Sequence, residues 1–201
     1  MLGALAILCF FPMAIPPGGA SSPRRTADLR IGRESIPGAT YFATFCAARR
    51  APLLDSDTAR AAGHDACRAL ERDGDAAVLA ATIMPEHVHL LLRLGVRLSL
   101  DRVIAKWKSQ VRRACPGLVW QANYFEHRLR SRESSEPYAW YVFMNPYRAR
   151  LVDLGDCWRG WWSGSQCAWG FLDRARPGPC PQPQWMEEVE VTARSLTTGE
   201  P

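Results

Sequence analysis

The sequence predicts an α+β domain with a ferredoxin-like split βαβ arrangement, followed by one added helix. Three observations support this prediction. Strand-like and helix-like segments follow one another in the order β-α-β-β-α-β-α, turn residues separate them, and 201 residues suffice for one sizeable core. In such a fold, four strands form an antiparallel sheet and two helices cover one face. The added, C-terminal helix is then expected to cross the open face.

The first four elements are predicted from composition and turn signals. Residues 39–46 are rich in β-branched and aromatic side chains, which favours a strand. The alanine-rich residues 57–72 favour a helix. Residues 76–84 are apolar almost throughout and predict a second strand, which Pro85-Glu86 interrupts before a third strand at residues 87–94.

The next three elements depend on periodicity and capping residues. Apolar side chains at helical spacing predict a helix from Ser99 to about Ala114, ended by Cys115-Pro116-Gly117. A short fourth strand is expected at residues 124–129. Ser134-Ser135-Glu136-Pro137 supplies a serine cap and a proline in the first turn of the last helix. Asn145-Pro146 is expected to bend and end that helix.

The chain is expected to divide into three parts: a hydrophobic leader and linker outside the fold (residues 1–35), the working domain (36–155), and a Trp/Gly/Pro-rich C-terminal wrap with a loose tail (156–201). The leader resembles a signal-peptide core but lacks a positive n-region, so export is a minor alternative. Seven scattered cysteines without a CxxC pair give no support for a zinc ribbon and favour a reducing compartment. We therefore expect a cytoplasmic, nucleoid-associated protein with no membrane partner.

Positive charge is concentrated in the middle of the chain. The formal charge is +5, and residues 97–150 contain eleven arginines and lysines against four carboxylates. Such a local excess favours binding to nucleic acid. Nearby aromatic side chains are candidates for stacking on unpaired bases, although most of them are expected in the core. The residues expected to contact DNA are Arg102, Lys106, Lys108, Arg112, Arg113, Arg128, Arg130 and Arg132.

His87 and His89 are the most informative pair in the sequence. They are two residues apart in a predicted strand, so both side chains are expected on one face of the sheet. Two neutral imidazoles in this position can bind a metal if other residues complete the ligand set. The alternative is a histidine pair that is hydrogen-bonded at a sheet surface.

Tyr141 and Asn145 are four residues apart on the last helix and therefore share a face. A tyrosine hydroxyl is a weak nucleophile and needs a Lewis acid that activates its target. A divalent ion bound by the two histidines and the Asn145 amide oxygen would polarise a phosphate. This mixed oxygen and imidazole set suits Mg²⁺ or Mn²⁺. Spacing alone does not exclude Tyr138 or Tyr147 as the nucleophile.

Five ordered segments together resemble the single-tyrosine HUH transposases (the IS200-like superfamily), and most closely the REP-associated tyrosine transposases. The resemblance covers about residues 36–165. The segments are Ile36–Phe42, Met84–Leu91, Val119-Trp120-Gln121 through Phe125-Glu126-His127, Tyr141–Pro146 with Arg148, Ala149, Leu151 and Val152, and Trp158–Ser163.

The resemblance implies a role for each matching residue. Tyr141 would be the nucleophile, His87 and His89 metal ligands, and Asn145 the third ligand or a polar contact beside the metal. Enzymes of this kind cleave single-stranded DNA, form a 5′-phosphotyrosine link and can rejoin a free 3′-hydroxyl. Glu126 and His127 resemble a family pair near the site, for which a supporting role behind the ligands and a plain strand-end hydrogen bond are equally open.

Two departures from the family pattern leave a second function open. Arg150 stands where a glycine commonly follows the Asn-Pro segment, and Tyr147 replaces a small aliphatic residue. The alternative is therefore a domesticated or inactive protein that binds DNA hairpins. An unrelated metal hydrolase would need another acidic ligand, and Glu86 is expected on the face opposite His87. A homodimer is an open expectation, as is use of Tyr141 by the partner subunit.

Overall fold

The computed structural model describes residues 34–174, 185 and 187–192. Its helices and strands follow the predicted order, with three additions. The elements are β1 (Thr40–Cys46), the 3-10 turn η2 (Ala48–Arg50), α1 (Asp57–Arg72), β2 (Ala76–Ile83), β3 (His87–Leu94), α2 (Leu100–Ala114), β4 (Phe125–Arg128), α3 (Glu136–Arg148), β5 (Trp161–Ser163) and α4 (Gly170–Arg174).

The sheet has the strand order β4-β1-β3-β2-β5, and every neighbouring pair is antiparallel. Its first four strands have the ferredoxin-like order, so the predicted α+β fold class is confirmed. The predicted count of four strands is wrong by one, because β5 pairs with Ala80–Thr82 at the edge of β2. Three residues between Gly160 and Gly164 carry too little periodicity to predict a strand that forms only through this pairing.

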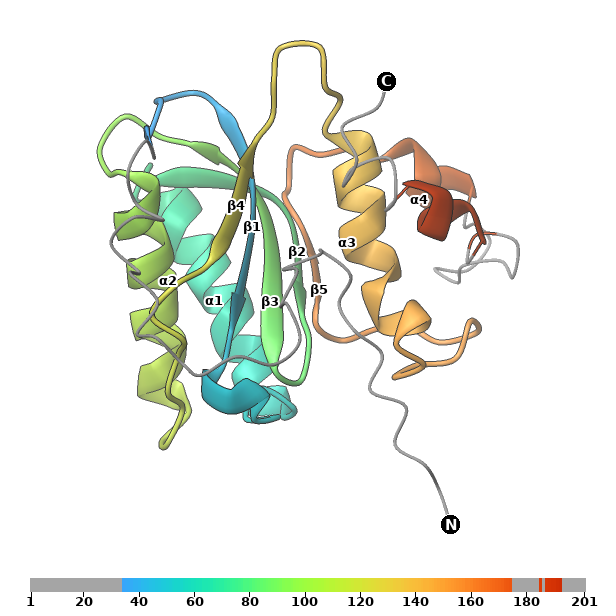
Figure 1. Cartoon of the computed structure of the whole chain (residues 1–201), viewed down its shortest axis with the longest axis horizontal. Coiled ribbons are helices and arrows are strands. Elements are labelled where there is room, and N and C mark those ends of the chain that lie inside the picture. The colour runs from blue at the N-terminus through green and yellow to red at the C-terminus, as the bar shows by residue number, and fades with distance from the viewer. Residues whose placement is uncertain (1–33, 175–184, 186, 193–201) are drawn as a thin grey trace, which may run out of the picture.

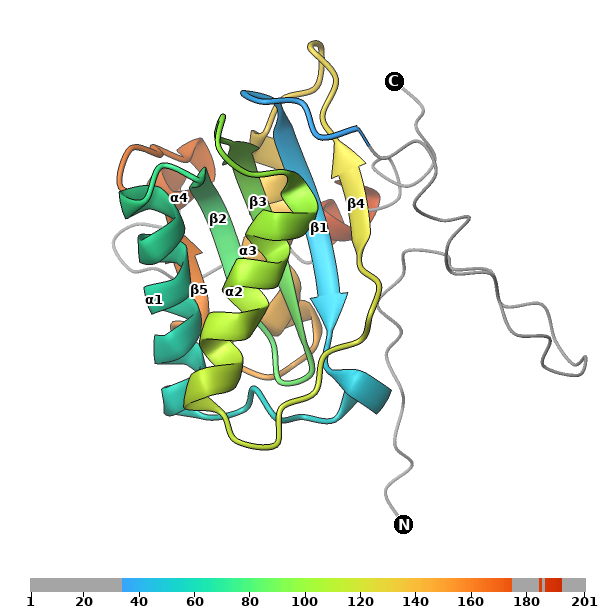
Figure 2. The ribbon, with the colours of Figure 1, turned by 90° about the vertical axis from the view of Figure 1, so that its left-hand side faces the viewer.

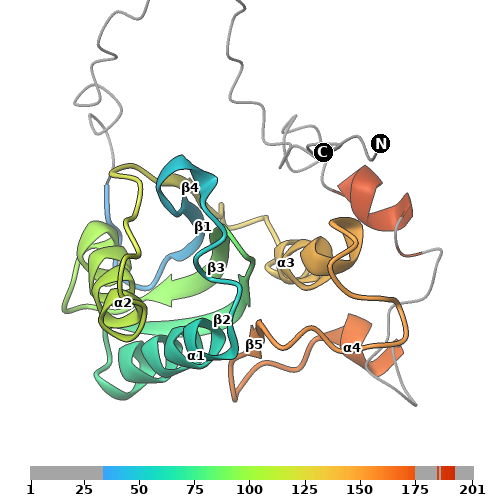
Figure 3. The same cartoon turned by 90° about the horizontal axis from the view of Figure 1, so that it is seen from below.

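The helices divide between the two faces of the sheet, as Figure 1 shows. Helices α1 and α2 pack side by side on one face, in front of the strands in Figure 2. Helix α3 crosses the other face over β2 and β3, with α4 beyond it (Figure 3). Two apolar cores result, one centred on Trp107 of α2 and the other on Phe42 of β1 with the buried face of α3.

Helix α3 continues through Pro146 to Arg148, so the expectation that it ends at Asn145-Pro146 is wrong. Proline has no backbone N–H and leaves the carbonyl four residues earlier, that of Val142, without its usual helical donor. The hydroxyl of Thr82 on β2 donates to this carbonyl at 2.8 Å. A side chain of the sheet thus supplies the donor that the Val142 carbonyl lacks because of Pro146. The same hydrogen bond holds α3 against the sheet.

The end of α3 also explains one departure from the family pattern. Arg150 has φ 54°, in the left-handed region that favours glycine, and its N–H donates to the carbonyl of Tyr147. The chain therefore leaves the helix in the conformation that a glycine would adopt. The expectation that the substitution alters the helix exit is not borne out in the backbone.

The terminal expectations fall mostly on residues that the structure does not describe. The leader prediction concerns residues 1–33, which lie outside the described residues. Of the linker, Ser35 contacts the domain, where its Oγ accepts a hydrogen bond from the Leu100 N–H. The side chain of Ser99, the N-cap residue of α2, makes no capping hydrogen bond. Among the described helices, none is long and apolar enough to cross a membrane. The five described cysteines are all free thiols.

Candidate active site

His87 and His89 begin β3 and point to the face that α3 covers, as the strand period predicts, while Val88 enters the opposite core. Each histidine is only 1% exposed. Their Nε2 atoms lie 3.0 Å apart, and the ring planes are nearly perpendicular at 84°. The two imidazoles therefore direct one nitrogen each to the same point.

The opposite nitrogen of each ring is fixed by a neighbouring side chain. Thr44 on β1 lies directly across from His89, and its Oγ1 is 2.7 Å from His89 Nδ1. Oε1 of Glu86 is 3.0 Å from His87 Nδ1. Because a carboxylate oxygen accepts, His87 carries its proton on Nδ1 in this contact, which leaves the Nε2 lone pair available.

Glu86 points toward His87, contrary to the prediction from the sequence. Strand alternation predicted that Glu86 points away from His87, but Glu86 lies in the turn between β2 and β3, where alternation does not apply. Its carboxylate also lies 3.9 Å from Arg50 of η2. Glu86 thus orients His87 from the side opposite to the converging nitrogens.

The pKa of His89 is held well below its usual value, first by burial and then by unfavourable electrostatic interactions with His87 and Arg148. A hydrogen bond with the Asn145 side chain opposes this decrease. The result is a ring held in its neutral form. Neutral imidazole is the form that binds metal ions.

Helix α3 brings Tyr141 and Asn145 to the histidines. The Tyr141 ring is 2% exposed and packs edge-on against His89, with 5.6 Å between ring centroids. Asn145 donates from Nδ2 to the Tyr141 carbonyl at 2.8 Å, while its side chain also contacts His89. The four residues singled out from the sequence are therefore neighbours.

The other two tyrosines on α3 have different partners. Tyr138 stacks on His127 and donates its hydroxyl to Glu133 at 3.3 Å. Tyr147 donates its hydroxyl to the Asp156 carbonyl at 3.0 Å. Of the three, Tyr141 is the one whose ring lies against the histidine pair.

Glu126 and His127 are not brought together at the site. On β4 they alternate, so His127 faces α3 and Glu126 faces the α2 side of the sheet. His127 Nε2 lies 3.2 Å from the Glu133 carboxylate, beside Tyr138 rather than beside His89.

Helix α2, which carries five of the predicted basic contacts, lies on the face of the sheet opposite to α3, the helix that covers the histidines (Figure 2). Arg102, Arg112 and Arg113 are exposed, but Lys106 is held by Asp73 and Asp75.

Lys108 is half-buried, donates to the Gln121 carbonyl, and has its pKa lowered to about 8 by burial. It borders a hollow of about 450 Å³, to which Arg112, Trp120 and Tyr124 also contribute.

The three remaining arginines of the predicted interface do not form one strand edge. β4 ends at Arg128, and Arg130 and Arg132 lie in the loop that leads to α3. The loop is stabilised by Glu133, whose carboxylate accepts the Arg130 backbone N–H. Two of these three arginines therefore lie beyond the strand.

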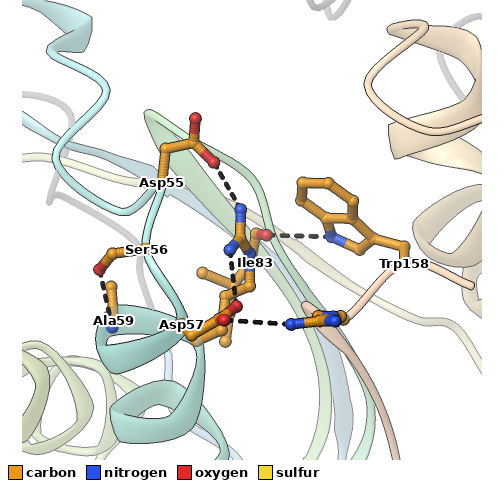
Figure 4. Close-up of polar contacts among 8 residues, drawn as sticks. Asp55, Ser56, Asp57, Ala59, Ile83 and Trp158 are labelled. Atoms are coloured by element: carbon orange, nitrogen blue, oxygen red, sulfur yellow. Dashed lines mark hydrogen bonds and ion pairs between the residues drawn. The ribbon is translucent and has the colours of Figure 1, made fainter.

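The turn that precedes His87 is anchored from the C-terminal side. Trp158 donates its indole N–H to the Ile83 carbonyl at 3.1 Å, at the last residue of β2, as Figure 4 shows. The guanidinium of Arg60 lies over the Trp158 ring and pairs with Asp55 and Asp57. Trp158 thus holds the end of β2, just before the turn that leads into β3 and its two histidines.

The residues present fit a divalent metal. Two Nε2 atoms converge, both Nδ1 atoms are fixed by other groups, and an amide side chain is adjacent. In the described part of the chain, no three His, Cys, Asp or Glu side chains gather as a metal site, so Asn145 would have to be the third protein ligand. Two imidazoles and one amide leave room for oxygen ligands from a substrate.

Sequence reasoning missed three residues that shape this site. Thr44 and Thr82 lie in register on either side of His89, but pairing across strands is needed to find them. Arg148 is two helical turns after Tyr141, and its guanidinium lies 5.6 Å from the Tyr141 ring centroid. Its i+7 spacing was the available signal.

Comparison with known proteins defines the class. Residues 35–128 match the family model described as "Transposase IS200 like". This part of the chain is similar to IS200-like transposases, and the resemblance stated from the sequence is confirmed. The proteins that it resembles in this way are enzymes, the tyrosine transposases. The matched residues include both histidines and end before α3.

The chain is similar to one curated protein and to two solved structures as follows. The REP-associated tyrosine transposase of Escherichia coli strain K12 is 28% identical over 131 residues, which cover 63% of this chain and 77% of the relative. A solved REP-associated tyrosine transposase bound to a REP hairpin is 25% identical with a TM-score of 0.49, covering 60% of this chain and 73% of that one. A putative transposase from Deinococcus radiodurans is 18% identical with a TM-score of 0.40, covering 60% and 90%.

Proposed function

We propose that this protein cleaves single-stranded DNA and transfers the cut strand through a 5′-phosphotyrosine at Tyr141. The observation that carries the proposal is the packing of a buried tyrosine against two histidines whose Nε2 atoms converge. The name of the Escherichia coli relative supports the same chemistry.

The proposed step exchanges one phosphoester bond for another. The Tyr141 hydroxyl loses its proton, and its oxygen forms a bond to the phosphorus. The bond from phosphorus to the 3′-oxygen breaks, and that oxygen gains a proton and leaves as a free 3′-hydroxyl. The reverse reaction with another 3′-hydroxyl releases Tyr141 and joins the strands. No cofactor is consumed in either direction.

His87, His89 and Asn145 would hold a divalent metal, Mg²⁺ or Mn²⁺, which would polarise the phosphate when bound. Transposases of this family generally depend on a metal. Thr44 and Glu86 keep the two rings in the orientation that binding requires. Because Tyr141 packs against His89 of its own chain, we propose that one subunit contains the whole site, whether or not a homodimer forms.

We further propose that the substrate is single-stranded DNA next to a hairpin. Exposed Arg102, Arg112 and Arg113 on α2 support binding to backbone phosphates. The hollow between Lys108, Trp120 and Tyr124 supports stacking of an unpaired base.

The test is a covalent-adduct assay on single-stranded DNA from the flanks of the gene, with Mn²⁺ or Mg²⁺. Wild-type protein should give a slower-migrating protein–DNA species, which Tyr141→Phe and a chelator abolish. Tyr147→Phe is the matched control, because it removes a phenol from the same helix and should leave the adduct. DNA binding without any adduct would instead support the alternative, a hairpin-binding protein without catalysis.

A further inference from the structure

Arg148 places a positive charge next to the candidate nucleophile and the histidine pair. It lies in the last turn of α3, seven residues after Tyr141 and therefore on a similar face of the helix. Its guanidinium carbon is 5.6 Å from the Tyr141 ring centroid. Its charge also contributes to the lowered pKa of His89, so its field reaches the histidine pair.

The guanidinium has no polar partner in the described part of the chain. Its Nε is buried and finds no hydrogen-bond acceptor among the described residues. No described carboxylate forms an ion pair with it, whereas Arg60 and Arg159 both pair with Asp57. A buried N–H without an acceptor is unfavourable and uncommon in folded proteins.

Two structural explanations account for only part of this arrangement. The C-terminal end of a helix favours a positive charge, and the face of an aromatic ring attracts one. Neither effect supplies an acceptor for the buried N–H or a counter-charge for the guanidinium. An anionic ligand bound between Arg148 and the histidine pair would supply both.

We propose that Arg148 binds a non-bridging oxygen of the phosphodiester that Tyr141 attacks. This inference deepens the proposed function and rests on it. A guanidinium offers several N–H donors in one plane, which matches the oxygens of a phosphate. With one oxygen directed to the histidine side and another to Arg148, the phosphorus would be presented to the Tyr141 hydroxyl, and charge that accumulates during attack would be stabilised.

The experiment pairs a protein variant with a neutral substrate linkage. Adduct formation is measured for wild type and Arg148→Met on a normal phosphodiester and on each methylphosphonate diastereomer, which replaces one non-bridging oxygen with a methyl group. Arg148→Met should slow the reaction of the normal diester about 100-fold, the range for loss of one charge-stabilising donor. With the diastereomer that lacks the oxygen bound by Arg148, the same variant should lose less than about threefold, because the interaction is already absent and the two changes are not additive.

Three further measurements separate this role from a structural one. Arg148→Lys, which keeps the charge but not the planar donors, should recover part of the rate. The exposed Arg150→Met is the matched control and should react as wild type does. The melting temperature of Arg148→Met should be unchanged or raised, because an unpaired, half-buried charge is removed, whereas a structural arginine would lower it on substitution.

Equal losses for Arg148→Met on all three substrates would overturn the inference, as would a wild-type rate in that variant. Binding is measured in parallel in the Tyr141→Phe background, where no cleavage is needed. The inference is supported if Arg148→Met weakens binding of the normal diester but does not change binding of the methylphosphonate diastereomer that lacks the oxygen bound by Arg148. If wild type forms no adduct on any DNA, the proposed function fails first and this inference fails with it.

Discussion

Thr44 orients His89 through one hydroxyl, and this contact gives a direct test of the metal site. In Thr44→Val the ring loses its partner at Nδ1 and is no longer held with Nε2 toward His87. Affinity for Mn²⁺, measured by calorimetry, should fall about 10- to 100-fold, the usual effect of removing such a partner. Thr40→Val on the same strand face, opposite Arg93, is the control and should bind as wild type does. Equal affinity in both variants would contradict this role.

Lys108 makes stability depend on pH in the alkaline range. Burial lowers its pKa from 10.5 to about 8, so between pH 8 and 10.5 the folded protein has released a proton that the unfolded chain still holds. Stability should therefore rise with pH in this window, and the charged lysine is unfavourable below it. Urea unfolding should show Lys108→Met gaining stability relative to wild type at pH 7, and losing that relative gain by pH 10. A difference that is constant with pH would contradict the assignment.

The site was predicted from the sequence to the extent that it depends on local spacing. The HxH period placed both histidines on one face, and the i, i+4 spacing placed Asn145 beside Tyr141. Thr44 and Thr82 were missed because their proximity to His89 depends on strand register. Arg148 was missed because its position at the site depends on how α3 packs on the sheet. Glu86 was misplaced because the strand period was extended into a turn.

Helix α3 depends on Thr82 for its position over the histidines. The Thr82 hydroxyl donates to the Val142 carbonyl that Pro146 leaves without a helical donor. Thr82→Val keeps the side-chain shape but removes this donor, so the free energy of unfolding should fall by about 1–3 kcal/mol, the cost of a buried unsatisfied carbonyl. Adduct formation should slow as well, because Tyr141 sits one residue before Val142.

Thr82→Ser provides the control for packing. It retains the hydroxyl and removes a methyl group, so it should recover most of the stability and of the rate. Urea unfolding and the adduct assay measure the two effects. If Thr82→Val unfolds at the same urea concentration as wild type, the hydrogen bond does not hold the helix.

Elements with strong local signals were predicted closely, and those that depend on tertiary contacts were not. The bounds of α1 and β3 match the prediction residue for residue. The passage of α3 through Pro146 was missed because a hydroxyl from β2 replaces the lost donor, which no helix pattern records. The strand β5 was missed because it exists only through pairing with β2.

Across the whole molecule, the candidate site and the basic helix α2 occupy opposite faces of the sheet (Figure 3). The arginines of α2 such as Arg112 are exposed, so they should bind phosphates and release counterions. For single-stranded DNA, Arg112→Ala should reduce the slope of log affinity against log salt by about 0.7. Fluorescence anisotropy at several salt concentrations measures the slope.

Lys106 serves as the control for this prediction, although the sequence placed it in the same interface. Its ammonium is already neutralised by Asp73 and Asp75. Lys106→Gln, which keeps donors for both carboxylates, should leave the salt slope unchanged. A smaller slope for Lys106→Gln and an unchanged one for Arg112→Ala would show that charge in the sequence, rather than exposure in the fold, identifies the DNA contacts.

The central claim is that Tyr141 becomes covalently joined to DNA beside the histidine pair. The most direct measurement is mass spectrometry of the wild-type adduct after nuclease and protease digestion, with metal present. We predict a nucleotide linked through its 5′-phosphate to the peptide that contains Tyr141, and a released strand that a polymerase extends from its 3′-hydroxyl. A nucleotide on Tyr138 or Tyr147, or cleavage that leaves no protein-linked nucleotide, would contradict it.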